Sequence, residues 1–266
     1  MEARARTARP ERSAREQFDR QAEHYDEQWS RWTEASLRWL VEAAQPRPTD
    51  RALDVATGTG FTAAGLAPHV ASVVGLDVSP GMLEQARQRC TRLGFANVAF
   101  REGTAEALPF EEGCFDLVTC RIAPHHFLDV RQFACEVARV LRPGGRLVVA
   151  DTSAPEGDPV ADAWQNETER LRDPSHVRNY TASEWREIVE GAGLIISHLS
   201  TGSDDMVIPL SDWLLKAGCT PPQCAALMDR FATAPGPIRS TFRIRPIPTG
   251  DTLFQWHRVS VVAGKA

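Results

Sequence analysis

Apolar positions recur along this chain with two different spacings. Between residues 51 and 151, short apolar runs of strand length alternate with segments whose apolar residues have helical spacing. The runs predict strands at residues 51–56, 72–77, 97–101, 115–121 and 145–151. Strands that alternate with helices form a mostly parallel sheet with helices on both faces. The pattern therefore predicts an α/β fold with a doubly wound sheet.

The flanking regions extend this pattern. Helical spacing runs from about Glu16 to Ala44, with Trp29, Trp32 and Trp39 on one stripe, which predicts a helical N-terminal segment. After Asp151 a polar stretch at 155–179 interrupts the alternation, and a capping box at Thr181 restarts it. A sixth strand is predicted at 194–199, two short helices at 209–232 and a last strand at 252–262. The whole sheet then has seven strands.

These elements predict four parts in the chain. Residues 1–48 form a helical segment that closes over the site, and residues 49–154 form a ligand-binding core. Residues 155–180 are an insertion. Residues 181–266 complete the sheet and carry a second insertion near 203–250, which we expect to bind the second substrate.

The strongest chemical signal is the turn after the first predicted strand. The segment from Leu53 to Gly60 passes from an apolar run into small residues, so the backbone can approach a ligand closely, and a helix N-terminus follows. The next strand ends at Asp77, whose carboxylate can accept hydrogen bonds from both hydroxyls of a ribose. This combination predicts a nucleotide-type cofactor at the carboxyl edge of the sheet.

The glycines alone do not identify the cofactor. Gly58 and Gly60, with Ala63, fit the G-x-G-x-x-A pattern of nicotinamide-binding proteins and leave S-adenosylmethionine equally open. Asp54 favours S-adenosylmethionine, because dinucleotide-binding folds usually have an apolar residue or glycine at this position, at the end of the first strand.

Several further segments resemble one family, the class I S-adenosylmethionine-dependent methyltransferases, and within it the ubiquinone and menaquinone type. The resemblance covers roughly residues 15 to 200, with Ala56 in place of the first glycine of the family's acidic-x-G-x-G-x-G motif. The segments that carry it are Phe18-Asp19, Ala22, Tyr25-Asp26, 79–83, 103–110, 115–118 and 141–147. It implies a Rossmann-like methyltransferase fold, S-adenosyl-L-methionine as cofactor, and a last strand antiparallel to the fifth.

The resemblance also implies a set of cofactor-binding residues. Asp54 is expected near the methionine amino group, Asp77 at the ribose, and Arg121 at the methionine carboxylate or in solvent. Thr104 stands where the family usually has an aspartate for adenine, and as a neutral acceptor it should hold the ring less firmly. The expected set is Asp54, Ala56, Gly58, Gly60, Asp77, Val78, Met82, Thr104, Ala105, Arg121 and Tyr25.

Two histidines are the candidates for proton transfer. His125 and His126 follow the fourth predicted strand, where the loop should border the methyl group, and imidazole titrates near neutrality. A structural hydrogen bond for one and solvent exposure for the other are the competing explanations. Within the family pattern His126 fits a catalytic role better than His125. The sequence has no His, Cys and carboxylate cluster with ligand spacing, so no metal is predicted.

The aromatic residues outside the predicted sheet suggest where an acceptor binds. They could line a pocket for a flat or lipophilic molecule, although at helical spacing such residues more often form core. The candidates are Trp29, Trp32, Trp164, Trp213, Phe231 and Phe242.

Composition narrows the choice of partners and location. The formal net charge of −5 argues against a nucleic-acid substrate, and no apolar stretch approaches the length of a membrane span or secretory signal. Six cysteines without regular spacing predict reduced thiols, consistent with a cytoplasmic protein. The sequence leaves a homodimer open.

The expected function is methyl transfer from S-adenosylmethionine to a carbon, oxygen or nitrogen atom of a small molecule. Three alternatives stay open: methylation of RNA or protein, an S-adenosylmethionine-binding enzyme that transfers no methyl, and a nicotinamide oxidoreductase. The acceptor cannot be inferred, because this fold serves many chemistries.

Overall fold

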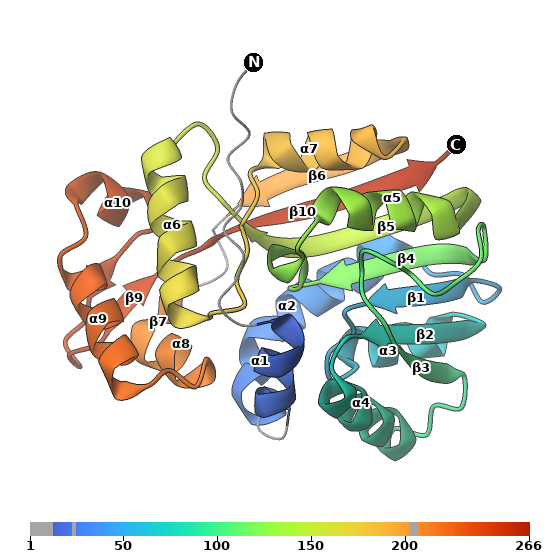
Figure 1. The fold of residues 1–266 in the computed structure, drawn as a ribbon, viewed down its shortest axis with the longest axis horizontal. Coiled ribbons are helices and arrows are strands. Elements are labelled where there is room, and N and C mark those ends of the chain that lie inside the picture. The colour runs from blue at the N-terminus through green and yellow to red at the C-terminus, as the bar shows by residue number, and fades with distance from the viewer. Residues whose placement is uncertain (1–12, 23–24, 203–206) are drawn as a thin grey trace.

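Seven strands form one sheet in the order β3-β2-β1-β4-β5-β10-β6, with helices on both faces (Figure 1). The computed structural model describes residues 13–22, 25–202 and 207–266, except for the side chains of residues 25–33 and 216. Strands β1 to β5 pair in parallel where they are neighbours, and β10 is antiparallel to both β5 and β6. The predicted seven-stranded, doubly wound sheet and its antiparallel last strand are confirmed. The strands are β1 (Arg51–Val55), β2 (Ser72–Asp77), β3 (Val98–Glu102), β4 (Phe115–Arg121), β5 (Leu141–Ser153), β6 (Leu194–Gly202) and β10 (His257–Lys265).

Two hydrophobic layers hold the helices to the sheet. On one face Leu40 of α2 and Leu66 of α3 are fully buried, and on the other Phe133 of α5 and Trp185 of α7 are fully buried. Burying one such side chain stabilises the fold by roughly 1.5–3 kcal/mol. Helix α4 packs beside β2 and β3. The helices bordering the sheet are α1 (Ala14–Gln21), α2 (Tyr25–Ala44), α3 (Phe61–Leu66), α4 (Pro80–Arg92), α5 (Val130–Val140) and α7 (Ala182–Gly191), with short 3-10 turns η1 (Ala67–His69) and η2 (Pro124–His126).

A second lobe stands beyond the carboxyl ends of the strands, at the left of Figure 1. Its own aromatic core includes Phe231, Phe242 and Trp256, each at most 1% exposed. The elements of this lobe are α6 (Pro159–Arg172), α8 (Leu210–Lys216), α9 (Pro221–Ala232), α10 (Gly236–Thr241) and a small sheet of β7 (Ile208–Pro209), β9 (Thr252–Phe254) and β8 (Arg245–Pro246).

The structure adds detail to two predicted segments and corrects one predicted strand. The helical N-terminal segment consists of two helices, α1 and α2. The expected polar insertion at 155–179 contains helix α6, which begins behind an Asp158 cap that accepts from Ala161 N. The expected last strand is divided, because the fully buried Trp256 and the hydrogen bond from Gln255 N to Phe242 O turn the chain between β9 and β10.

The aromatic residues that were candidates for an acceptor pocket have a different role in the structure. Trp164, Trp213, Phe231 and Phe242 contact one another or share neighbours at ring-centroid distances of 5.3 to 6.0 Å. Phe231 and Phe242 are 0% exposed, so they form the core of the second lobe and leave no ring face for a ligand. The side chains of Trp29 and Trp32 lie outside the described residues.

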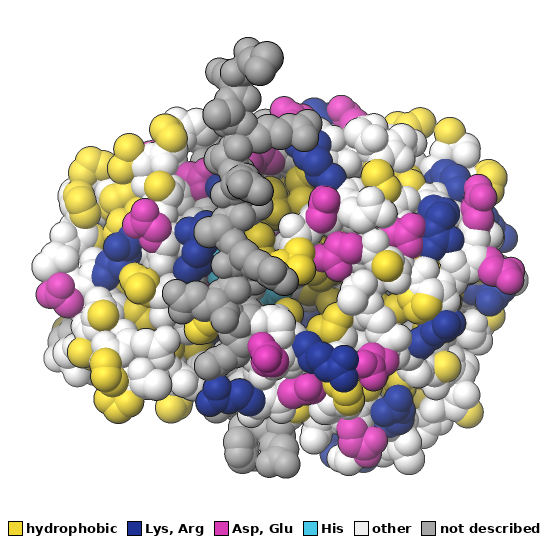
Figure 2. All heavy atoms as spheres, in the orientation of Figure 1, with side chains coloured by type: hydrophobic (Ala, Val, Ile, Leu, Met, Phe, Trp, Pro, Cys, Tyr) yellow, Lys and Arg dark blue, Asp and Glu magenta, His cyan; other side chains and the backbone are white. Residues whose placement is uncertain are grey.

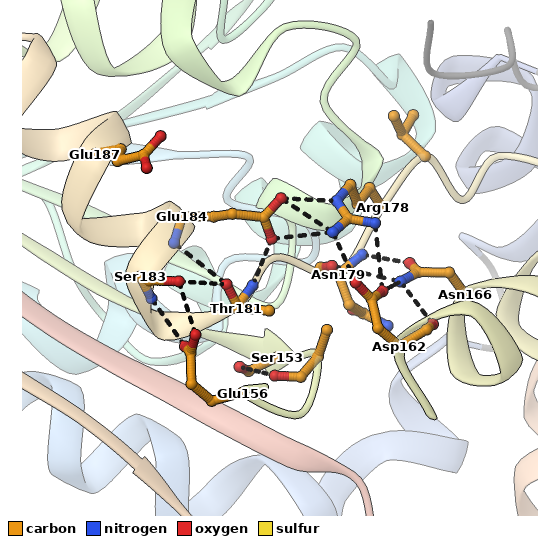
Figure 3. Close-up of polar contacts among 12 residues, drawn as sticks. Ser153, Glu156, Asp162, Asn166, Arg178, Asn179, Thr181, Ser183, Glu184 and Glu187 are labelled. Atoms are coloured by element: carbon orange, nitrogen blue, oxygen red, sulfur yellow. Dashed lines mark hydrogen bonds and ion pairs between the residues drawn. The ribbon is translucent and has the colours of Figure 1, made fainter. Parts of the chain in front are cut away.

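A charged cluster anchors α6 to the rest of the molecule (Figure 3). The Arg178 guanidinium lies 2.9 Å from Asp162 Oδ2 on α6 and 3.0 Å from Glu184 Oε1 on α7. Glu184 also completes the capping box at Thr181, which starts α7. The side chain of Arg178 is 24% exposed, so this pairing is partly shielded from water.

We expect Arg178→Met to lower the free energy of unfolding by about 2 kcal/mol, since it leaves two partly buried carboxylates without their cation. A thermal unfolding midpoint lower by roughly 4–8 °C is the corresponding observable. Arg131→Met is the matched control. It breaks the Arg131–Glu187 pair, whose side chains are 59% and 69% exposed, and should change stability by less than about 1 kcal/mol. Equal effects of the two variants would contradict an anchoring role for Arg178.

Candidate functional site

A cavity of about 470 Å³ lies beyond the carboxyl ends of the parallel strands. Its walls come from the turn after β1, the end of β2, the loops after β3 and β4, and one side of α1. This volume is in the range of small-ligand sites. Figure 2 shows a hollow between the two lobes where histidine side chains are visible beside hydrophobic ones.

The turn after β1 has an unusual backbone. Ala56 and Gly58 both have φ of 54°, in the left-handed region, and both line the cavity. Ala56 adopts this conformation although it has a Cβ, which is uncommon. Gly60 has a different role, because a Cβ there would lie 2.9 Å from Ala86 Cβ. It does not line the cavity but allows the turn to pack closely on α4.

Asp77 connects this turn to the next one. Its Oδ2 accepts from Gly58 N at 2.8 Å, and its Oδ1 accepts from Ser79 N at 3.0 Å. Burial raises the pKa of this carboxyl above its ordinary value. Each carboxylate oxygen can accept a further hydrogen bond, and the residue lines the cavity. Asp77 can therefore accept hydrogen bonds from a ligand in the cavity.

Asp54 lies behind the residues that form the cavity wall. Its two oxygens accept from Thr57 Oγ1 at 2.7 Å and from Thr119 Oγ1 at 2.8 Å. Burial raises the pKa of Asp54 to about 6, in spite of these hydrogen bonds. Asp54 is 1% exposed and is not part of the cavity wall, whereas Thr57 is. Any influence of Asp54 on a ligand therefore passes through Thr57 and through its charge.

The end of β4 contributes a charged residue and a strained one. Arg121 lines the cavity, and its Nε donates to Thr62 Oγ1 while Nη1 donates to Ser36 Oγ. Ile122 has φ of 54°, which a β-branched residue rarely adopts, and its N–H donates to Ala150 O at 2.8 Å. The strained turn directs the chain into η2.

Four other expected cofactor residues come from the end of β2, the start of α4 and the loop after β3. Val78, Met82, Thr104 and Ala105 all line the cavity. Met82 is 1% exposed, and its N–H donates to Ser79 Oγ at the start of α4. These positions suit a flat apolar ring with one polar edge.

Helix α1 closes one side of the cavity through Phe18 and the residues before it. Asp19 holds the helix in place, because its Oδ1 accepts from Ser79 Oγ at 2.5 Å and from Gly81 N at 3.1 Å. A Cβ at Gly81 would lie 3.1 Å from Ala22 Cβ, so a larger residue there would push the two helices slightly apart. The side chain of Tyr25, another expected cofactor residue, lies outside the described residues.

His125 is fixed by a carboxylate at the end of β5. Its Nδ1 lies 2.6 Å from Asp151 Oδ1, and its backbone N–H donates to Asp151 Oδ2 at 3.0 Å. Burial by itself would lower the pKa of His125, but the charge and hydrogen bond of Asp151 raise it above the ordinary value. Because a carboxylate can only accept, Nδ1 carries the proton, and Nε2 is the atom that can take up another.

His126 lines the cavity, and its ring meets the edge of Phe18 at a centroid distance of 5.0 Å. Its Nδ1 lies 3.0 Å from Ser175 Oγ, which donates to Asp173 Oδ1 at 2.7 Å. Since the one hydroxyl proton of Ser175 goes to Asp173, His126 Nδ1 must donate, and Nε2 is the proton-free nitrogen. Burial and the neighbouring His125 lower the pKa of His126 to about 4, so it is neutral at pH 7.

Several residues of this site were not predicted from the sequence. Asp151 had a usable signal, because it ends a predicted strand at the edge where ligands bind. Asp173, Ser175 and His176 lie in the expected insertion, where no local pattern indicated that their segment returns to η2.

Neither a metal-binding cluster nor a membrane-spanning helix is found among the residues that the structure describes. In that part of the chain, no group of three or more His, Cys, Asp or Glu side chains could hold a metal ion. None of the helices described is long and apolar enough to cross a membrane.

Comparison with known proteins gives consistent matches. Residues 53–149 match the family described as Methyltransferase domain. The chain is 36% identical over 227 residues to the protein named "Uncharacterized methyltransferase YcgJ" of Bacillus subtilis (strain 168), covering 85% of this chain and 88% of that protein. It is 36% identical over 149 residues to demethylmenaquinone methyltransferase of Tropheryma whipplei (strain Twist), covering 53% of this chain and 59% of that protein.

Solved structures agree with these matches. The crystal structure of YcgJ has a TM-score of 0.82 at 35% identity, covering 87% of this chain and 98% of that chain. Geranyl diphosphate methyltransferase, solved in complex with SAM, has a TM-score of 0.63 at 18% identity over 87% of this chain and 85% of that chain, and so shares the fold. The extent and identity of the YcgJ match, together with the family model, show that this chain belongs to the methyltransferase family and has the class I methyltransferase fold.

Proposed function

We propose that this protein transfers a methyl group from S-adenosylmethionine to an oxygen, nitrogen or carbon atom of a small molecule. One observation carries the proposal: a carboxylate of the ribose-binding type, Asp77, lines the same cavity as His126, whose ring centroid lies 4.2 Å from that of His125. A nucleotide-binding wall beside a pair of imidazoles suits methyl transfer to a protonated nucleophile.

The residues present suit this cofactor. Asp77 would accept from the ribose hydroxyls, while Met82 and Ala105 would contact adenine with Thr104 at its polar edge.

The left-handed turn at Ala56 and Gly58 leaves room for the methionine portion. Arg121 would face its carboxylate, and Asp54, through Thr57, would favour its ammonium group. The solved complex of another methyltransferase of this fold with SAM supports the assignment.

Bound S-adenosylmethionine supplies an electrophilic methyl group on a sulfonium, whose departure needs no proton donor. The chain must then align the acceptor with that methyl and remove the acceptor's proton where it has one. Alignment alone can lower a barrier by roughly 7–11 kcal/mol in favourable intramolecular cases. Phe18 and η2 enclose the reacting region and limit the access of water.

Within the histidine pair we assign different tasks. His125 is the stronger base, because Asp151 stabilises its protonated form, so we assign it as the proton acceptor beside His126, which forms the cavity wall. His126 remains neutral and orients the acceptor through its own Nε2. The family pattern alone favours His126 as the base, and the Asp151 contact is the reason to prefer His125.

Titration with S-adenosylhomocysteine, with NADH and NADPH as controls, tests the cofactor. We expect S-adenosylhomocysteine alone to bind. Asp77→Asn should weaken this binding roughly 10- to 100-fold, since the substitution removes a charge-assisted acceptor. His126→Asn should leave the dissociation constant nearly unchanged. Binding of a nicotinamide instead, or equal loss in both variants, would contradict the assignment.

Asp54 predicts a pH dependence of cofactor binding. With its pKa at about 6 in the free protein, the carboxyl is protonated at pH 5 and charged at pH 7. A bound ammonium group favours the charged form and lowers this pKa, so binding must strengthen as the pH rises from 5 to 7. Calorimetry at several pH values measures this. Asp54→Asn should remove most of the dependence, and an unchanged slope in that variant would argue against a role for Asp54.

The histidine pair can be examined without knowing the acceptor. In an NMR titration His125 should gain its proton at a pH above the ordinary histidine value, whereas His126 should stay neutral down to about pH 4. Asp151→Asn should lower the pKa of His125, because the stabilising charge is lost. A His125 titration that is the same in both proteins would remove the basis for its assignment as base.

A further inference from the structure

Arg89 of α4 contacts the turn after β1 from outside the cavity. Its Nε donates to Thr59 O at 2.8 Å, and its guanidinium carbon lies 3.5 Å from the centre of the Phe61 ring. Thr59 and Phe61 both line the cavity, whereas Arg89 stands behind them. The Arg89 side chain is half-buried, which strengthens a cation stacked on an aromatic ring. One arginine therefore holds a backbone carbonyl and an aromatic ring of the cavity wall at the same time.

This contact continues a stripe of residues along one face of α4. Met82, Ala86 and Arg89 have the spacing that places side chains on the same side of a helix. Met82 lines the cavity, and Ala86 packs against Gly60. Arg89 reaches the residues on either side of Gly60. The face of α4 that contributes to the cavity wall thus also holds the turn beside it.

A second arginine reaches the same part of the chain from the sheet. Arg121, at the end of β4, donates from Nε to Thr62 Oγ1 at 3.1 Å. Thr62 follows Phe61 on α3, so the junction between the turn and α3 is held by Arg89 on one side and by Arg121 on the other. Arg121 lines the cavity, and the proposed function assigns it to the carboxylate of the cofactor.

The strand order places this junction at one end of the cavity. Neighbouring strands follow one another as β3, β2, β1 and β4. The cavity residues at their carboxyl ends are, in the same order, Thr104, Asp77, the turn at 59–61 and Arg121. A cofactor with its adenine at Thr104 and its ribose at Asp77 extends its sulfur and amino acid toward β1 and β4. The turn then borders the amino-acid end of the cofactor.

We propose that Arg89 is a positioning residue that determines how tightly the amino-acid end of S-adenosylmethionine is held. It fixes Thr59 O and covers one face of Phe61, so both groups keep one position before the cofactor binds. Ala56 in the same turn has a left-handed backbone, which persists only where surrounding contacts impose it. The inference rests on the proposed function, because it requires S-adenosylmethionine as the ligand of this cavity.

The experiment compares two ligands that share the adenosine and differ in the amino acid. S-adenosylhomocysteine carries the amino-acid chain on its sulfur, whereas methylthioadenosine has a methyl group in its place. In calorimetry with the full chain, Arg89→Met should raise the dissociation constant of S-adenosylhomocysteine about tenfold and that of methylthioadenosine by less than about twofold. Arg87→Met is the matched control on α4. Arg87 pairs with Glu84 at 3.7 Å and its side chain is 50% exposed, so this variant should bind both ligands as the wild type does.

A conservative variant separates the two contacts of Arg89. Arg89→Lys keeps the charge and an N–H donor but lacks the planar group that covers Phe61. Its dissociation constant for S-adenosylhomocysteine should lie between those of the wild type and Arg89→Met, with methylthioadenosine binding unchanged. This variant also carries the comparison if Arg89→Met does not fold.

Two results overturn the inference. Equal weakening of both ligands would mean that Arg89 only supports the fold, and unchanged binding of both would mean that the turn keeps its shape without Arg89. Failure of S-adenosylhomocysteine to bind the wild-type chain would instead overturn the proposed function.

Discussion

The Asp77 carboxylate holds together the segments on which the cofactor cavity depends. One oxygen accepts from the left-handed turn after β1, and the other accepts from Ser79 at the start of α4. Ser79 in turn caps α4 and donates to Asp19, which docks α1 over the cavity. A single buried acid therefore sets the position of two turns and, through Ser79, of the helix that covers them. Burial makes its charge expensive, and backbone donors offset that cost.

The same balance of burial and hydrogen bonding differentiates the two histidines of η2. They are adjacent in sequence and their ring centroids are 4.2 Å apart, yet their pKa values move in opposite directions. Asp151 touches His125 directly, whereas Asp173 reaches His126 only through Ser175. A protonated His125 further disfavours a charge on His126. One strong base beside one neutral, hydrogen-bonding ring is the result.

Helix α6 and the segment after it complete this arrangement from the second lobe. Val177 N and Arg178 N both donate to His125 O, so the segment that carries Ser175 and His176 is joined to η2 by backbone hydrogen bonds. The Arg178 side chain then ties the same segment to α6 and α7. The aromatic core of the lobe gives α6 a rigid support, which a polar site needs if its groups are to stay oriented.

The sequence by itself determined the sheet, because buried parallel strands leave continuous apolar runs and the turns between them need small or capping residues. The same reasoning predicted that Ala56, Gly58, Asp77, Thr104 and Arg121 would meet at one edge of the sheet, where parallel strands end, and these residues do line one cavity; their contacts with a cofactor stay a proposal. Only the tertiary structure decided that Gly60 serves packing, that Asp54 lies behind Thr57, and that the aromatics of the second lobe are core. It also decided which carboxylate faces which histidine. Asp151, Asp173 and His176 are 25 to 50 residues from η2 along the chain, and such contacts depend on how separate elements pack, which no local periodicity encodes.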